Sequence, residues 1–123
     1  MKTFKSTINN KSASFRSNKE SMMELVDKLN SFLKISNIQG NEIALKRAKE
    51  RGKSLTREKL TKLLDKNSPF IELMPLAGLK HENGFGPGGT TIAGIGFVHK
   101  KLCVINANIG TKKGGVVDYA TSL

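Results

Sequence analysis

Apolar side chains recur every three or four positions along the first part of the chain, a spacing that predicts helices. A first helix is expected to begin at Ser17, because Ser17 and Glu20 have the spacing of a capping box. The pattern therefore predicts one amphipathic helix before Gly40, which interrupts it. The apolar face of this helix would consist of Met22, Leu25, Val26, Leu29 and Leu33.

A second, strongly basic helix is predicted to follow Asn41 and to reach Arg51. The side chain of Asn41 can cap its first turn, and Gly52 provides a C-terminal stop. A helix with little apolar surface needs a partner surface to remain ordered. The apolar stripe of this one is narrow and consists of Ile43, Ala44 and Ala48.

A third helix is predicted to begin at Thr56, whose hydroxyl group would cap the first turn. Leu55 before it and Leu60 within it have the spacing of a hydrophobic staple. The segment 67–69, Asn-Ser-Pro, is expected to end the helix. Its packing face would consist of Leu60, Leu63 and Leu64.

Beyond the third helix the pattern changes to strands. A short strand is predicted over 70–74, a loop over 77–89, and a hairpin made of strands 90–98 and 102–107 with a turn at 99–101. The second hairpin strand is almost continuously apolar, a composition typical of strands covered on both faces. Such a hairpin needs additional strands and layers around it.

Glycine within the first hairpin strand has a specific meaning. Gly94 and Gly96 lie among β-branched residues, and glycine in a strand often marks a close approach of another backbone or of a ligand. Cys103 lies in the facing strand, where a buried, inert thiol is favoured over a reactive one. As the single cysteine, it excludes an internal disulfide and fits a reducing compartment.

Positive charge is concentrated in the helical half of the 123 residues. The net charge is +11, and residues 1–67 hold 16 Lys and Arg against 7 Asp and Glu, whereas residues 68–123 hold 5 against 3. Such a basic face attracts phosphates of nucleic acid or of a nucleotide-bearing ligand, or an acidic partner. It is equally consistent with a solvated helix surface.

Candidate chemistry is sparse. His81 and His99 have no cysteine or carboxylate at ligand spacing, so no metal site is predicted, and no catalytic arrangement is visible. The loop 108–115 places two lysines beside two glycines after a buried strand. It could offer backbone donors and positive charge to an anionic ligand, or it could be a surface turn. Residues 1–14 have the hydroxyl-rich, acid-free composition of organellar transit peptides but contain no Arg, and a flexible tail is favoured.

Several segments share, in order and in one register, the sequence pattern of a single enzyme family. These segments are Phe15–Asn18, Met22–Val26, Arg51–Lys59, Leu63–Asp65, Ser68–Leu73, Leu76–Gly78, Pro87–Gly89, Ile92–Gly96, Cys103–Ile105, Ala107–Asn108 and Lys113–Gly115. Over residues 15–123 the chain resembles the opening of the carboxyltransferase (β) subunit of biotin-dependent acyl-CoA carboxylases, in particular the 3-methylcrotonyl-CoA carboxylase branch. It departs from the family pattern at Ile109, where an aspartate is usual, and at Lys112, where an apolar residue is usual.

The resemblance implies a mixed α/β chain (α+β within these residues) with helices followed by the first strands of an incomplete crotonase-like (ClpP/crotonase) spiral domain. It implies a tail over 1–14, a basic helical segment over 15–67 and the start of the carboxyltransferase domain over 68–123. Subunits of this family are several times longer, and their oxyanion-hole glycines lie beyond residue 123. No catalytic residue is therefore expected in this chain, which alone would be inactive.

The resemblance also implies ligands and partners. Family members transfer a carboxyl group from carboxybiotin, carried on a partner biotin carboxylase or carrier subunit, to an acyl-CoA such as methylcrotonyl-, propionyl- or acetyl-CoA, without a metal in this segment. Lys113, Gly114 and Gly115 match the family's Lys-Gly-Gly loop and are expected to contact CoA, and Arg51, Lys53 and Arg57 either face CoA phosphates or a neighbouring subunit or are solvated. A homo-oligomer without membrane association is expected, in the cytoplasm or, in a eukaryote, the mitochondrial matrix.

Two other hypotheses remain open at this point. The chain could be a small basic module that binds nucleic acid through its helical half, although no RNA- or DNA-binding motif is recognisable. It could also be an assembly piece that is completed by a second chain.

Overall fold

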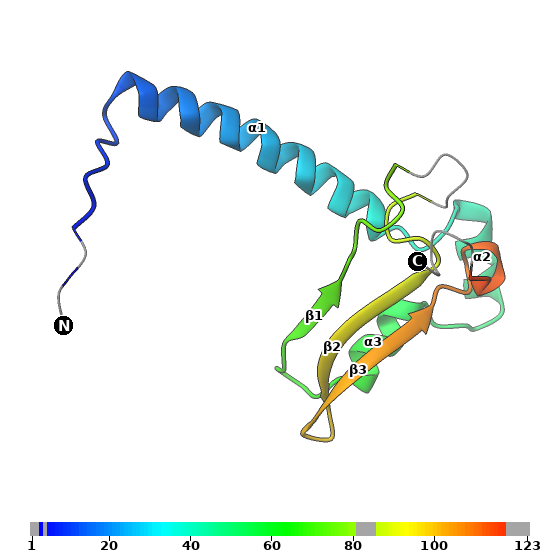
Figure 1. Ribbon diagram of the computed structural model, residues 1–123. Helices are drawn as coiled ribbons and strands as arrows, with labels where there is room; N and C mark the ends of the chain where they lie inside the picture. Colours follow the sequence, from blue (N-terminus) through cyan, green and yellow to red (C-terminus); the bar gives the residue numbers. More distant parts are fainter. Residues whose placement is uncertain (1–2, 4, 81–85, 118–123) are drawn as a thin grey trace. The chain divides into compact units, whose positions relative to one another are not determined.

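A computed structural model describes residues 3, 5–80 and 86–117, and its elements are labelled in Figure 1. The chain forms two compact units, residues 1–31 and residues 32–123. The helices are α1 (Ala13–Ser36), α2 (Glu42–Glu50) and α3 (Thr56–Leu63). The strands are β1 (Phe70–Leu73), β2 (Thr91–Val98) and β3 (Lys101–Asn108), followed by a short 3₁₀ turn, η1 (Lys113–Gly115).

Helix α1 begins earlier than predicted. The Ser12 hydroxyl oxygen accepts a hydrogen bond from the Phe15 N–H (3.2 Å), and the Ser12 carbonyl accepts one from the Arg16 N–H (3.2 Å). The predicted start at Ser17 was wrong, because a serine upstream already satisfies the first turn and nothing after it interrupts the helix. The predicted apolar face is largely exposed among the described residues, including Met22, Leu25, Val26 and Leu29.

Helix α2 forms as predicted. The Asn41 side-chain oxygen accepts a hydrogen bond from the Ala44 N–H (2.8 Å), which confirms the predicted cap. Gly52 has a φ of 64°, the left-handed conformation expected of a residue that ends a helix. None of the α2 residues is buried, so its narrow apolar stripe remains accessible.

Helix α3 is capped by a different residue from the one predicted. The Glu58 carboxylate accepts a hydrogen bond from the Leu55 N–H (2.9 Å), whereas the Thr56 hydroxyl donates to the Asn108 carbonyl (3.0 Å). The predicted Thr56 cap was therefore wrong, since that hydroxyl serves a contact with β3. Of the predicted packing face, Leu60 is buried and Leu64 packs beside it. Leu63 is half exposed, because only Leu60 and Leu64, four positions apart, face the core.

The three strands form one antiparallel sheet in the order β1-β2-β3. Val98 pairs with Lys101, so the hairpin turn consists of His99 and Lys100, which have φ values of 49° and 62°. Two consecutive residues with positive φ match the twist of a two-residue hairpin turn. The turn is one residue shorter than predicted, and Lys101 belongs to the strand.

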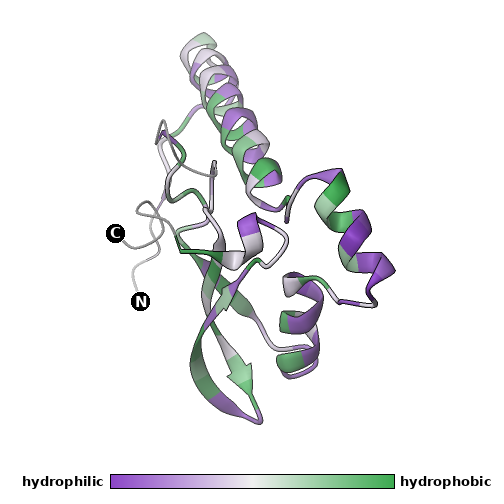
Figure 2. Ribbon diagram, turned by 90° about the vertical axis from the view of Figure 1, so that its right-hand side faces the viewer, coloured by the Kyte–Doolittle hydropathy of each residue, from purple (hydrophilic) through white to green (hydrophobic). Residues whose placement is uncertain are grey.

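One face of the sheet carries the core. Leu60 of α3 lies against Ile92 and Ile105, and Leu64 and Phe70 pack around them together with Ile109. Figure 2 shows α3 on this side of the sheet. A close approach exists at both strand glycines, but side chains account for most of it where a backbone or a ligand was predicted. A Cβ at Gly96 would lie 2.5 Å from Leu64 Cδ2, and one at Gly94 would overlap the Phe70 ring and lie 2.8 Å from the Ile71 carbonyl oxygen.

The opposite face of the sheet is apolar and open among the described residues. Strand register places Ile71 of β1, Ile95 of β2 and Val104 of β3 side by side on this face. The exposed fractions of Ile71, Leu102 and Val104 are 61%, 66% and 78%. The predicted hairpin with two apolar faces is therefore present, but the described residues cover only one of them. Cys103, on the covered face, is half-buried and not fully buried as predicted.

Candidate anion-binding groove

A groove of about 900 Å³ lies within the second unit, between α2, the start of α3 and the loop that follows β3. Its volume is within the usual range for small-molecule sites. The groove is lined by Asn41, Ile43, Ala44, Arg47, Ala48, Arg51, Lys53, Ser54, Leu55, Thr56, Lys59, Asn108, Gly110, Thr111, Lys113 and Gly114.

The groove is strongly basic. Its lining includes Arg47, Arg51, Lys53, Lys59 and Lys113, and no carboxylate is among the lining residues. All five of these side chains are exposed. Like charges gathered in a concave surface raise the local positive potential and attract anions. The groove is therefore a candidate binding site for an anionic ligand.

Helix α2 presents one continuous face to the groove. Ala44 and Ala48 lie one turn apart, and Arg47 and Arg51 repeat the same spacing beside them. The apolar stripe that sequence analysis identified on this helix thus lines the groove together with two arginines. Arg47 and Lys59 were not singled out from the sequence. Arg47 lies one helical turn before Arg51, and Lys59 lies one turn after Thr56. These spacings indicate a shared binding surface only once the groove is known.

The predicted loop residues lie at one end of the groove. Lys113, Gly114 and Gly115 have φ values of 42°, 72° and 79°, a run of left-handed conformations that glycine tolerates best. Lys113 and Gly114 line the groove, whereas Gly115 does not. The Gly115 N–H donates to the Lys112 carbonyl (2.9 Å), so this donor is used within the loop.

The loop is fixed to the rest of the unit by several polar contacts. The Ile109 N–H donates to the Thr90 carbonyl (2.6 Å), and the Thr90 hydroxyl donates to the Val116 carbonyl (2.8 Å). The Thr111 hydroxyl donates to the Gln39 carbonyl, next to Gly40, whose φ is 141°. Ile109, which stands where an aspartate is usual, is 1% exposed and belongs to the core. These contacts hold the groove end of the loop in one conformation.

Lys112 does not line the groove and is partly buried. Its Nζ donates to the Gly89 carbonyl (3.0 Å). Burial, with a smaller contribution from the nearby Arg57 guanidinium, lowers the pKa of Lys112. The lowered pKa reflects the cost of holding this charge in a partly buried position.

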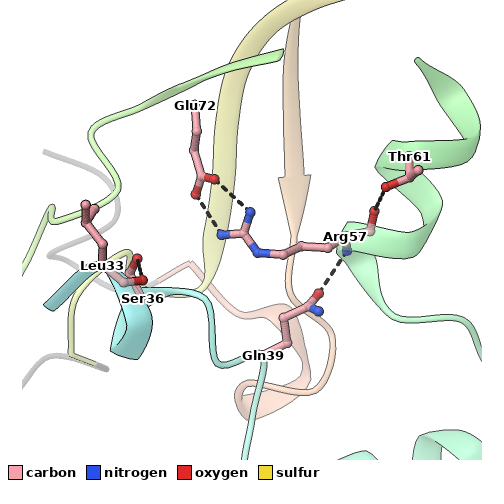
Figure 3. A network of polar contacts seen from close by, with 6 residues as sticks. All are labelled: Leu33, Ser36, Gln39, Arg57, Thr61 and Glu72. Carbon is pink, nitrogen blue, oxygen red and sulfur yellow. Dashed lines mark hydrogen bonds and ion pairs between the residues drawn. The ribbon is translucent and has the colours of Figure 1, made fainter. Parts of the chain in front are cut away.

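Arg57 does not line the groove. Figure 3 shows its guanidinium group facing Glu72 of β1, with two hydrogen bonds of 2.7 and 2.8 Å. Its backbone N–H donates to the Gln39 side-chain oxygen (2.9 Å). Of the three basic residues considered from the sequence, Arg51 and Lys53 line the groove. Arg57 instead joins α3 to the sheet and to the segment before α2.

The described residues contain no cluster of His, Cys, Asp or Glu suited to a metal ion. His99 lies in the hairpin turn, and His81 lies outside the described residues. Within the described part of the chain, no helix combines the length and the apolar character needed to cross a bilayer.

Comparisons with known proteins give a consistent result. No protein-family model matches the chain. The chain is 48% identical over 91 residues to the biotin-dependent 3-methylcrotonyl-coenzyme A carboxylase β1 subunit of Mycobacterium tuberculosis, covering 74% of this chain and 17% of that protein. It is 39% identical over 108 residues to the mitochondrial methylcrotonoyl-CoA carboxylase β chain of Arabidopsis thaliana, covering 88% of this chain and 18% of that protein.

The fold has a solved counterpart. The crystal structure of the geranyl-CoA carboxylase β subunit of P. aeruginosa matches with a TM-score of 0.78 and 32% identity, covering 91% of this chain and 21% of that one. This match confirms the predicted fold class, a mixed α/β chain related to part of a crotonase-like carboxyltransferase subunit.

The chain is thus homologous to the carboxyltransferase β subunits of biotin-dependent acyl-CoA carboxylases, as its sequence pattern predicted. Within this class, the two sequence relatives are methylcrotonyl-CoA carboxylase β subunits. The chain spans less than a fifth of the length of either relative.

Proposed function

We propose that this chain serves as part of a carboxyltransferase subunit that transfers a carboxyl group from carboxybiotin to an acyl-CoA such as 3-methylcrotonyl-CoA. The observation that carries the proposal is 48% identity to a biotin-dependent 3-methylcrotonyl-CoA carboxylase subunit over 74% of the chain. The open apolar face of the sheet supports the same proposal, since a face with Leu102 and Val104 exposed needs a covering layer.

The chain's own residues contribute binding surface and not catalysis. We assign the contact with CoA to Lys113, Gly114 and Gly115, supported by the position of Lys113 and Gly114 in the basic groove. The biotin is held by a partner subunit, and the chemistry of carboxyl transfer is supplied by that cofactor. The enolate would be stabilised by backbone donors from outside this chain.

The proposed assembly follows from the same reasoning. The division into a tail over 1–14, a basic helical segment over 15–67 and a carboxyltransferase segment over 68–123 remains our proposal, as does assembly into a homo-oligomer. We place the protein in the cytoplasm or the mitochondrial matrix, which is consistent with the mitochondrial relative.

A complementation experiment tests the proposal. The chain is co-expressed with a polypeptide that supplies the rest of a methylcrotonyl-CoA carboxylase β subunit, and carboxylation of 3-methylcrotonyl-CoA is measured with the biotin-bearing subunit. The chain alone should give no product, and the pair should give more product than the second polypeptide alone. A pair that co-purifies and yet adds no activity would count against the proposal. The matched control is a chain with Leu102→Glu and Val104→Glu, which should fail to assemble.

Binding of nucleic acid is a second candidate function, and one observation favours it. The groove holds five basic side chains and no carboxylate, a composition that also suits the phosphate backbone of RNA. Retention of single-stranded RNA that falls steeply between low and moderate salt would support this candidate. Binding of acyl-CoA without retention of RNA at the same low ionic strength would exclude it.

A further inference from the structure

A second pocket, of about 380 Å³, adjoins the basic groove within the second unit. Its apolar wall consists of Ile35 at the end of α1, Ile38 in the segment before α2 and Pro87 in the loop before β2. Ile35 and Ile38 are about half exposed, whereas Pro87 is buried. A short aliphatic chain that covered the two isoleucines would remove apolar area from water. The pocket therefore suits a small ligand with an aliphatic part.

The side chain of Lys112 lines the same pocket. Its Nζ donates to the Gly89 carbonyl (3.0 Å), and within the described residues this carbonyl is its only hydrogen-bond partner. The described part of the chain also places no carboxylate within ion-pair distance of this amine. Burial, together with the nearby Arg57 guanidinium, lowers the pKa of Lys112. A larger share of this amine is therefore neutral at a given pH than in an ordinary exposed lysine.

A neutral lysine amine is a nucleophile, because its nitrogen has a free electron pair. The hydrogen bond to Gly89 uses an N–H group of Lys112 and leaves that electron pair available. A lysine that is partly desolvated, without a carboxylate to hold its proton, is the form that proteins use for reactions with carbonyl carbon. The pocket thus combines a reactive amine with an apolar wall.

The backbone of Lys112 is held in place from both sides. Its N–H donates to the Ile109 carbonyl (2.9 Å), and its carbonyl accepts from the Gly115 N–H (2.9 Å). The preceding residue, Thr111, donates through its hydroxyl to the Gln39 carbonyl. A fixed backbone limits the positions that the amine can take and so lowers the entropic cost of bringing it to a bound reactant.

We propose that Lys112 is a site of N-acylation by short-chain acyl thioesters. The electron pair of Nζ attacks the thioester carbonyl carbon, a C–N bond forms, and the C–S bond breaks. The sulfur leaves as a thiolate, and the proton lost from the nitrogen balances its charge, so the products are an amide and a free thiol. The acyl chain then lies against Ile35, Ile38 and Pro87.

This modification goes beyond the proposed function, since it needs only an acyl thioester and neither biotin nor a partner subunit. Lys112 stands where the family pattern usually has an apolar residue, so the site is a feature of this chain and not of the family pattern. Acylation replaces a partly buried charge by a neutral amide with an apolar chain. The acylated side chain is therefore closer to the residue type that is usual at this position.

The experiment incubates the full chain at neutral pH with S-butyryl-N-acetylcysteamine, a small thioester without a nucleotide, and in parallel with butyryl-CoA. After digestion with a protease that does not cleave at lysine, mass spectrometry gives the acylation rate of each lysine. Lys112 should react at least about fivefold faster than the exposed lysines Lys46, Lys49 and Lys113. Lys112→Arg should abolish the fast phase, and the matched control Lys113→Arg should retain it.

A pair of isoleucine variants tests the role of the pocket separately from the reactivity of the amine. Ile38→Ser removes part of the apolar wall and should slow butyrylation of Lys112 about threefold. Ile43→Ser removes an equally exposed isoleucine from α2, outside this pocket, and should leave the rate unchanged. Equal slowing by both variants would overturn the assignment of the acyl chain to this pocket.

The remaining outcomes keep this proposal distinct from the proposed function. Acylation of Lys112 at the rate of the exposed lysines, or more slowly, with both thioesters would overturn the proposal and leave the complementation experiment unaffected. Fast acylation by the small thioester would support the proposal even if the chain and its companion polypeptide formed no active carboxyltransferase. Fast acylation by butyryl-CoA alone would show that CoA binding and not this pocket directs the reaction, and would overturn the proposal.

Discussion

The aromatic ring of Phe70 occupies the space above Gly94 that any other residue would fill with its side chain. Phe70 is the first residue of β1. Gly94 of β2 pairs with Glu72 of β1, and the next residue, Ile95, pairs with Ile71. A Cβ at Gly94 would also lie 2.8 Å from the Ile71 carbonyl oxygen, so the backbone itself limits the space. The glycine is therefore needed for the packing of β1 on β2.

Replacing this glycine should loosen the sheet. Gly94→Ala is expected to destabilise the second unit by about 1–3 kcal/mol, because the ring and the neighbouring backbone must move apart. Hydrogen exchange of the β2 amides measures the effect. The control is Gly110→Ala, where an added Cβ meets nothing within 4 Å, and it should leave exchange unchanged. Equal protection in both variants would contradict the packing that the structure shows.

The ion pair between Arg57 and Glu72 should contribute more than a surface salt bridge. Their side chains are 27% and 24% exposed, and two N–H groups meet two carboxylate oxygens. Arg57→Lys removes the paired geometry and should cost about 1–3 kcal/mol. A double-mutant cycle with Glu72→Gln, followed by urea denaturation, measures the coupling. Arg51→Lys, at an exposed groove position, is the control and should be neutral. A coupling energy near zero would mean that the pair is effectively solvated.

The lowered pKa of Lys112 gives a definite sign to the pH dependence of stability. Between this lowered pKa and 10.5, the unfolded chain binds more protons than the folded chain, so stability should rise with pH in that window. Below the lowered pKa, the folded state carries the full cost of burying the charge. Urea midpoints measured for the protein and for Lys112→Met should therefore converge or cross as pH rises through the window. Parallel curves at all pH values would show that Lys112 titrates normally.

The uncovered sheet face should make the chain prone to association. Leu102 and Val104 of β3 are exposed on the same sheet face as Ile71 of β1, and an apolar patch of this kind binds hydrophobic dyes and other molecules. Leu102→Ser with Val104→Thr should lower dye fluorescence and increase the monomer fraction without loss of secondary structure. Ile105→Thr, on the covered face, should instead unfold the sheet. An unchanged monomer fraction in the first variant would mean that this face does not drive association in solution.

Local signals in the sequence predicted most of the elements. The Asn41 cap, the Gly52 stop and the hairpin turn depend on residues within a few positions of one another; the first two predictions held, and the turn was placed correctly but one residue too long. The start of α1 was missed because Ser12 and Ser17 are both suitable caps by sequence, and the earlier one is used. Thr56 was predicted to cap α3 because a threonine at that position is a good local cap. Its actual hydrogen bond is with Asn108, 52 positions away, and the local sequence does not reveal such a contact.

The groove was predicted only in part, for the same reason. Lys113 and Gly114 were identified from the family resemblance, and Arg51 and Lys53 from their charge. That Arg47 and Lys59 join them depends on how α2 and α3 lie in space, which the spacing of residues along one helix does not define. Arg57 has the same charge as Arg51, and only the position of Glu72 on β1 explains why it turns toward the sheet.

Helix α3 is attached near both of its ends to the same hairpin. At its start, Thr56 bonds the last residue of β3, and just after its end the Asp65 carboxylate accepts hydrogen bonds from the turn N–H groups of His99 (2.8 Å) and Lys100 (2.6 Å). The number of residues from 56 to 65 is thus matched to the length of the hairpin. Inserting or deleting one residue there would release one of the two attachments.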